Sequence, residues 1–311
     1  MAKVSGLGQK LLVGGYDISG DVQALESMTG GPALGDFTTI DQVAHVRQGL
    51  LRDGSGTIAT LMDPALAHPV LASLPTADTQ LMWLVNPLAV GSPSVCCTCL
   101  QLDYDVTRAA NGMLTMKTKF ESDGFGIEMN GLALTAGVRS DTTATNGASY
   151  DQGQGFTTPL VPASGTPVTN TSPLPASVVV AGGTVTGVSV NGVSVGSGDG
   201  TYTVPSGQAV TLTYSVAPTW TWTLQTVFGA QAYAQVTAFT GTSVTVTVQH
   251  SPDNATWSTL VAFAAVTAAP AFQRVAATGT VARYLQVITT GTFTAASFGC
   301  AVMVNPASVQ F

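Results

Sequence analysis

Polar and apolar residues alternate along much of the chain with the period of two that is typical of β-strands. In the first 139 residues this pattern predicts strands at 55–63, 78–85, 94–106 and 112–123. Residues 14–42 are interpreted as long loops. The fold class expected from this pattern is mainly β.

One helix is predicted at 63–75, where Asp63 can cap the first turn. Its apolar face comprises Leu66, Val70 and Leu74. Pro69 lies inside this stretch and cannot donate a helical hydrogen bond. The helix should therefore be short, kinked, or begin after Asp63.

The strands at 94–106 and 112–123 are joined by a turn-like stretch and predict a long hairpin with one apolar and one charged face. Matching the apolar faces sets Asp103 opposite Lys117, Leu102 opposite Thr118 and Leu100 opposite Phe120. The charged face then carries Asp103, Asp105, Lys117, Lys119, Glu121 and Asp123.

Three of the four cysteines lie in this hairpin. Alternation places Cys96 in the core and Cys97 with Cys99 on the charged face. Two residues apart on one strand, their Cβ atoms are about 7 Å apart, whereas a disulfide requires about 3.8 Å. A zinc site requires four ligands, and the cluster supplies only two cysteines on one face of the strand. It is therefore interpreted as plain thiols with no metal.

The rest of the chain predicts further β-structure. Residues 140–175 are rich in Thr, Ser, Gly and Pro and are interpreted as a linker. Asn191-Gly192 between alternating valines predicts a hairpin in a small β-module. Strands at 230–239, 242–250, 281–290 and 297–304 are typical of an antiparallel sandwich. The predicted domains are 1–158, 159–225 and 226–311.

The charge distribution limits the classes of function that fit this sequence. Charged residues are 9 % of the chain and the net charge is −7. Residues 140–273 contain no Lys or Arg, so clamping of nucleic acid is disfavoured. A surface past which DNA slides remains compatible. No apolar run reaches the ~18 residues of a membrane span, and the N-terminus lacks a signal core, so synthesis in a cytoplasm is expected.

Candidate catalytic chemistry is sparse. His45, His68 and His250 form no recognised metal spacing, and no phosphate-binding or nucleophile motif occurs. Asp103 and Asp105 could serve a glycosidase, but their lysine neighbours favour a solvated strand face. Trp220, Trp222 and Trp257 could form a glycan platform, although Trp220 and Trp222 fit the core of a small module at least as well.

Several segments together resemble a known family. They are 9–25, 49–75, 102–130 and 134–151, with 230–249 and 283–293 near the end. This ordered set resembles the major tail tube proteins of long-tailed phages, particularly those of actinobacterial hosts. The middle module, 159–225, looks like an insertion between the two matching parts.

The resemblance implies a tail-tube β-sandwich or half-barrel with one short helix, carrying Ig-like or sandwich-like outer modules. It implies a structural, non-catalytic protein without a cofactor that forms hexameric rings stacked into a tube. The partners would be other copies, tail proteins at the tube ends, and double-stranded DNA passing without specific binding. The location would be the virion tail, after synthesis in the bacterial cytoplasm.

The charged hairpin face would then line the lumen or the ring contacts. A second interpretation is a tail-tip or decoration protein that binds host-surface carbohydrate through its C-terminal sandwich.

Overall fold

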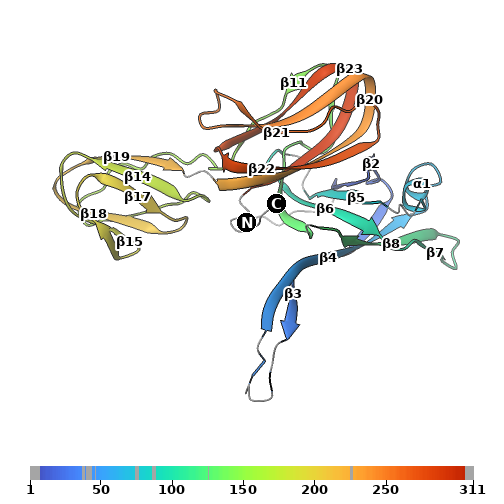
Figure 1. Cartoon of the computed structure of the whole chain (residues 1–311), viewed down its shortest axis with the longest axis horizontal. Coiled ribbons are helices and arrows are strands. Elements are labelled where there is room, and N and C mark those ends of the chain that lie inside the picture. Colours follow the sequence, from blue (N-terminus) through green and yellow to red (C-terminus); the bar gives the residue numbers. More distant parts are fainter. Residues whose placement is uncertain are drawn as a thin grey trace.

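A computed structural model describes residues 8–36, 39, 44–45, 47–73, 77–85, 89–124, 126–224 and 227–304. The chain is mainly β, as the alternation predicts, and its strands build several antiparallel sheets of the sandwich type (Figure 1). Within these ranges the helical structure is α1 (Ala67–Leu71). No helix in the described ranges has the length and apolar character needed to cross a membrane.

Sixteen of the described strands join in one large sheet. Those from the first part of the chain are β1 (Lys10–Val13), β2 (Tyr16–Asp17), β3 (Val22–Asp36), β4 (Arg47–Leu61), β5 (Thr79–Leu84), β6 (Pro93–Gln101), β7 (Asp105–Arg108), β8 (Leu114–Ser122) and β9 (Glu128–Ala133). The later ones are β10 (Arg139–Asp141), β11 (Thr145–Asn146), β12 (Tyr150–Asp151), β20 (Val227–Ser251), β21 (Ser258–Ala262), β22 (Ala271–Val281) and β23 (Tyr284–Val304).

This sheet folds back on itself into layers, because its central strands are apolar on both faces. One face of β1, β5 and β6 packs with α1, β4 and β8 around a core that includes Leu81, Ile58 and Phe120. The opposite face of the same strands packs on β20 and β23 through Met82 and Tyr233. Strands β20 to β23 enclose a further core of their own.

Strands β20 and β23 are each continuous, and they pair with one another over most of their length. The four runs predicted here are confirmed as strand over nearly all of their length, but their division is wrong, because 230–239 and 242–250 join in β20 and 281–290 and 297–304 join in β23. Gly241 lies at an irregularity of the pairing and Gly291 lies close to it on the partner strand, with φ of 153° and 119°. A Cβ at Gly241 would lie 2.4 Å from the Cα of Phe293. These glycines let two long strands bend together without breaking the ladder.

The inserted module, which we define as residues 167–224, forms two sheets of its own. Their strands are β13 (Pro167–Thr169), β14 (Ala176–Ala181), β15 (Thr184–Val190), β16 (Val193–Gly196), β17 (Gly200–Val204), β18 (Ala209–Val216) and β19 (Thr219–Leu224). The sheets have the orders β13-β18-β15-β16 and β17-β14-β19 and enclose a separate core. The predicted hairpin is confirmed: Asn191 and Gly192 both have positive φ, and Val190 pairs with Val193.

The stretch predicted as a linker is partly structured. Strands β10, β11 and β12 all pair with β23 between residues 139 and 151. The linker interpretation is therefore wrong for this part, because Thr and Ser side chains suit a strand as well as a coil.

The helix is short, as Pro69 predicts. Asp63 accepts a hydrogen bond from the Ala65 N–H at 2.7 Å, and the helix begins at Ala67. Its buried side chains are Ala67 and Leu71, while Leu66 and Val70 pack only partly against the core. Leu74 lies outside the described residues.

Candidate assembly surface

Four strands, β3-β4-β8-β7, form a continuous antiparallel part of the large sheet that we call the wall sheet. Each strand runs opposite to its neighbours, so β3 and β7 at the two edges also run in opposite directions. Neither edge strand has a further partner among the described residues. The β3–β4 hairpin projects from the body of the molecule (Figure 1).

The prediction of long loops at 14–42 is wrong for residues 22–36, which form β3. Three irregularities in the pairing with β4 interrupt the alternation of β3 and hide the strand signal in the sequence. Edge position removes a second signal, since an edge strand needs few buried side chains. Leu25 and Met28 pack only partly against the core.

The inner face of the wall sheet covers the core. Ile58, Met116 and Phe120 are fully buried there. Gly30 and Gly54 face one another on β3 and β4. Ile127 lies over both glycines, since a Cβ at Gly54 would be 2.7 Å from its Cγ1. The absence of side chains at these two positions lets the hairpin seat against Ile127.

The outer face of the wall sheet is polar. Along β8 the side chains alternate as predicted, with Met116, Thr118 and Phe120 buried and the odd-numbered residues exposed or half-buried. The odd-numbered residues of β4 pair with them and lie on the same face. The members of this outer face on β4 and β8 are Ser55, Thr57, Ala59, Leu61, Thr115, Lys117, Lys119 and Glu121.

Each lysine on the outer face is matched by carboxylates. The Lys117 Nζ lies 2.8 Å from a Glu26 oxygen on β3, reaching across the small Ala59, and Asp105 is its direct partner on β7. The Lys119 Nζ lies 2.8 Å from Glu121. Its hydrogen bond with Glu121 raises the pKa of Lys119, and the charges of Asp103 and Asp53 raise that pKa further. Lys119 therefore stays protonated.

The register between the two predicted strands differs from the prediction. Leu100 pairs with Glu121 and Gln101 with Phe120, whereas further along Asp105 pairs with Lys117. The predicted pairs Asp103–Lys117, Leu102–Thr118 and Leu100–Phe120 are wrong by one or two residues. The strand breaks between Gln101 and Asp105.

Asp103 causes this break. Its Oδ1 accepts the Lys119 N–H at 2.6 Å, the bond that a straight strand would make with a backbone carbonyl. The Leu102 N–H still donates to the Lys119 carbonyl at 2.9 Å. This break acts as a bulge, because it changes which residues face the core. On β6 the odd-numbered residues lie on the same side of the sheet as Phe120, whereas on β7 the even-numbered Val106 lies on that side.

This reversal explains the cysteines. Cys97 and Cys99 are buried at 1 % and 0 % exposure, so the prediction that they lie on the charged face is wrong. They share the core that contains Phe120, whereas Cys96 faces the layer of β20 and β23. All four cysteines are unbridged thiols. A hydrogen bond to Cys97, together with burial, raises the pKa of Cys99, and burial raises the pKa of Cys300 to about 12.

The predicted charged residues are thus brought together only in part. Lys117, Lys119 and Glu121 share the outer face, and Asp103 and Asp105 flank it from the bulge and from β7. Asp123 follows β8 and faces Asp78: burial and then the hydrogen bond and charge of Asp123 raise the pKa of Asp78. Glu26 and Asp53 also lie beside these lysines and were not predicted there. Glu26 belongs to the stretch interpreted as a long loop, and Asp53 precedes the strand predicted at 55–63.

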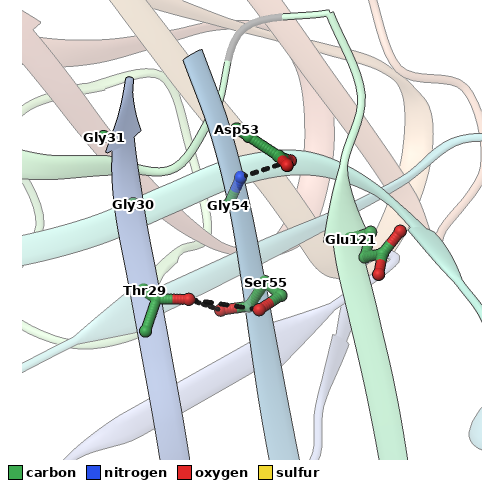
Figure 2. A pocket seen from close by; sticks show the side chains of 7 residues that line it. All are labelled: Thr29, Gly30, Gly31, Asp53, Gly54, Ser55 and Glu121. Carbon is green, nitrogen blue, oxygen red and sulfur yellow. Dashed lines mark hydrogen bonds between the residues drawn. The ribbon is translucent and has the colours of Figure 1, made fainter. Parts of the chain in front are cut away.

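A shallow, open hollow of about 290 Å³ lies on the hairpin beside β8. Figure 2 shows Asp53, Ser55 and Glu121 directed to one side, and Thr29 reaching across to Ser55 from β3. The Thr29 and Ser55 hydroxyls are 3.1 Å apart. No group of three or more His, Cys, Asp or Glu suited to a metal ion occurs in the described part of the chain.

Apolar side chains are exposed near β7, at one edge of the wall sheet. Those with more than a third of their surface exposed are Leu61, Leu102, Val106, Met113 and Leu114. Exposed apolar residues concentrated beside an unpaired strand are typical of a surface that contacts another protein.

The tryptophans do not form the expected platform. Trp220 and Trp222 are buried in the core of the inserted module, packed edge to face with ring centroids 5.4 Å apart. They are core residues, and the glycan-platform prediction is wrong for these two. Trp257 is half-buried in the loop between β20 and β21 and stays an untested prediction.

No protein-family model and no curated protein matches this sequence. Solved structures show weak similarity, and three of them are described here. The tail of an empty gene transfer agent particle with C6 symmetry gives 14 % identity and a TM-score of 0.27 over 39 % of this chain and 93 % of that one. The virion of a native gene transfer agent particle gives 13 % and 0.29 over 40 % and 97 %.

The Dit protein of phage SPP1, described as a hub of the adsorption apparatus in phages that infect Gram-positive hosts, gives 9 % identity and a TM-score of 0.28 over 97 % of this chain and all of that one. All three TM-scores are below 0.5, and all three identities are 14 % or less.

Proposed function

We propose that this protein is a structural subunit of a phage tail tube, in which six copies join their wall sheets into a ring and rings stack into a conduit for DNA. The observation that carries the proposal is the wall sheet itself: four antiparallel strands with two edges that have no partner strand in the described part of the chain, one buried face and one polar face. The sequence resemblance to tail tube proteins supports it independently.

The two edges suit one another. Because β3 and β7 run in opposite directions, β3 of one copy beside β7 of the next continues the antiparallel order across the seam. Head-to-tail pairing of two different edges generates a ring when the rotation closes. Closure satisfies the edge backbone groups that a monomer leaves to water, and it covers the apolar side chains beside β7.

The outer face suits a DNA lumen. Its two lysines, Lys117 and Lys119, are surrounded by Glu26, Asp53, Asp103, Asp105 and Glu121. Cations already paired with carboxylates offer little to phosphate, and a net negative wall repels DNA rather than holding it. The remaining positions are largely Ser and Thr. In this arrangement the inserted module lies on the outside of the ring.

The proposal assigns the protein no catalytic role and no cofactor. The paired carboxylates of a glycosidase would have to be Asp103 and Asp105, but Asp103 is engaged by the Lys119 backbone N–H and Asp105 opposes Lys117. Both residues therefore have structural tasks in the sheet. Tail proteins at the tube ends complete the set of expected partners.

Cysteine cross-linking tests the seam. Ser27 on β3 and Thr107 on β7 are exposed, and their ladder partners Thr57 and Thr115 belong to the outer face. A chain carrying Ser27→Cys and Thr107→Cys should give, on oxidation, a ladder of disulfide-linked oligomers. This ladder should end at one closed species of six copies. Replacing Ser27→Cys by Ala24→Cys or Thr29→Cys samples the neighbouring registers.

The two single variants are the controls and should give no ladder beyond a dimer. The native cysteines are buried and should not contribute. Absence of a ladder at concentrations where the protein assembles would refute the seam. Closed rings that never stack would favour the second interpretation, a protein of the tail tip, and would call for a glycan-binding screen.

A further inference from the structure

The inserted module is joined to the large sheet by two chain segments, which meet at one place. The incoming segment leaves β12 at Asp151, and the outgoing strand β19 ends at Leu224. A Cβ at Gly153 would lie 2.6 Å from a Leu224 methyl and 2.7 Å from the Arg283 Nε. Entry and exit are therefore in contact, and a side chain at Gly153 would separate them.

We call the place where the two segments meet the joint. A bidentate ion pair connects the chain across it. The Arg283 Nε and Nη2 donate to the two oxygens of Asp151, each at 2.7 Å. The same carboxylate accepts the backbone N–H groups of Gly153 and Gly155, both at 2.8 Å. Four donors thus converge on one carboxylate and shape the turn that enters the module.

We call Asp151, Arg283 and the hydrogen bonds between them the clamp. The clamp also contacts the core of the module. The Arg283 Nη2 also donates to the Phe156 carbonyl at 3.1 Å, and the Phe156 ring packs on Trp222 with centroids 5.9 Å apart. Leu174 packs against the core of the module and also against the core of the large sheet. Polar and apolar contacts therefore cross the joint together.

The joint is anchored on the side of the large sheet as well. Gln152 is buried, and its Nε2 donates to the Ala282 carbonyl at 2.8 Å while its backbone N–H donates to the Arg283 carbonyl at 3.0 Å. The chain entering the module is thus tied to β23 and to the turn between β22 and β23.

We propose that Asp151, Arg283 and the contacts around them hold the inserted module in one fixed orientation on the large sheet, so that it is a rigid projection and not a tethered domain. This is a property of the single chain and does not rest on the ring. In an assembly it would place every module in the same outward position.

Distance measurement by pulsed electron paramagnetic resonance tests this on the full chain. Spin labels go on Thr221→Cys in the module and Ser258→Cys on β21, both exposed, while the native cysteines stay buried. The labelled wild-type background should give a single narrow distance distribution. Asp151→Asn should widen it by about twofold or more, because the amide turns two acceptor sites into donors that face Arg283 and Gly155, and the turn that enters the module is then no longer held.

Asp141→Asn is the matched control. Asp141 accepts a bidentate pair from Arg139 at 2.8 and 2.7 Å beside the same strand β23, but away from the joint, so the distribution should stay narrow. Leu224→Ala, which removes the apolar contact at Gly153 and keeps all charges, should widen it. A broad distribution in the wild-type background, or an unchanged one in Asp151→Asn and Leu224→Ala, would overturn the proposal.

Discussion

Gly54 offers a sharp test of how the β3–β4 hairpin is held. The substitution Gly54→Ala adds one methyl group at a position where the ideal Cβ lies 2.7 Å from the Ile127 Cγ1 and 2.8 Å from the Thr29 carbonyl oxygen. Both distances are shorter than real Cβ contacts, so Ile127 and the hairpin must move apart by several tenths of an ångström. Overpacking of this kind costs about 1–3 kcal/mol.

A double-mutant cycle shows whether Ile127 is the cause. Ile127 is 8 % exposed, and Ile127→Ala alone should cost about 2–5 kcal/mol through the cavity that it leaves. In the double variant the new methyl occupies part of that cavity. The cost should then fall below the sum of the single costs by about 1 kcal/mol.

Urea unfolding followed by circular dichroism measures these differences as shifts of the midpoint at constant slope. Gly20→Ala is the matched control, because no atom lies within 4 Å of its ideal Cβ and its φ is not positive. That variant should be neutral or more stable by up to ~1 kcal/mol. A neutral Gly54→Ala, or strictly additive costs in the cycle, would refute the packing of the hairpin on Ile127.

Three further predictions concern pH, the module core and the thiols. Burial alone raises the pKa of Asp151, but the hydrogen bonds from Arg283, Gly155 and Gly153 outweigh it and leave that pKa below its ordinary value. The clamp therefore contributes fully above about pH 4, the pKa of an unfolded Asp, and its contribution is lost as the pH falls through the lower folded pKa. Tryptophan fluorescence of the module against pH should show this loss in wild type and not in Asp151→Asn; identical profiles would contradict it. Trp222→Ala should destabilise the module by about 3–5 kcal/mol, seen as lost hydrogen-exchange protection in β14 and β19, and a small effect would contradict its place in the core. The four cysteines should all resist maleimide labelling until the protein unfolds; faster labelling of Cys97 and Cys99 than of Cys96 would contradict the register of β6.

Local signals in the sequence predicted the parts of the fold that local chemistry decides. Asn191-Gly192 specifies its turn because both positions tolerate positive φ. The alternation of β8 is regular, so its buried and exposed faces follow directly. Pro69 indicates a short helix for a reason internal to the helix.

The errors arise where a distant contact overrides the local pattern. Asp103 replaces a carbonyl in the ladder of β8, and this one hydrogen bond inverts the burial expected for Cys97 and Cys99. Strand β6 is covered on both faces, so charge on one face was the wrong expectation. Strand β3 has irregular pairing and one open edge, and its hydrophobic pattern is correspondingly weak.

The candidate site was predictable in its charges and not in its geometry. Lys117, Lys119 and Glu121 share a face because they alternate on one strand. Glu26 joins them only through the hairpin, since it reaches Lys117 across Ala59 of the intervening strand. Contacts between strands far apart in the chain leave no periodic trace in the sequence.

Electron microscopy of the purified protein at rising concentration tests the central claim most directly. We expect rings with six-fold symmetry that stack into hollow tubes of regular axial repeat, with the inserted modules on the outside. Monomers or dimers that persist at high concentration, or rings with the inserted module toward the lumen, would contradict it.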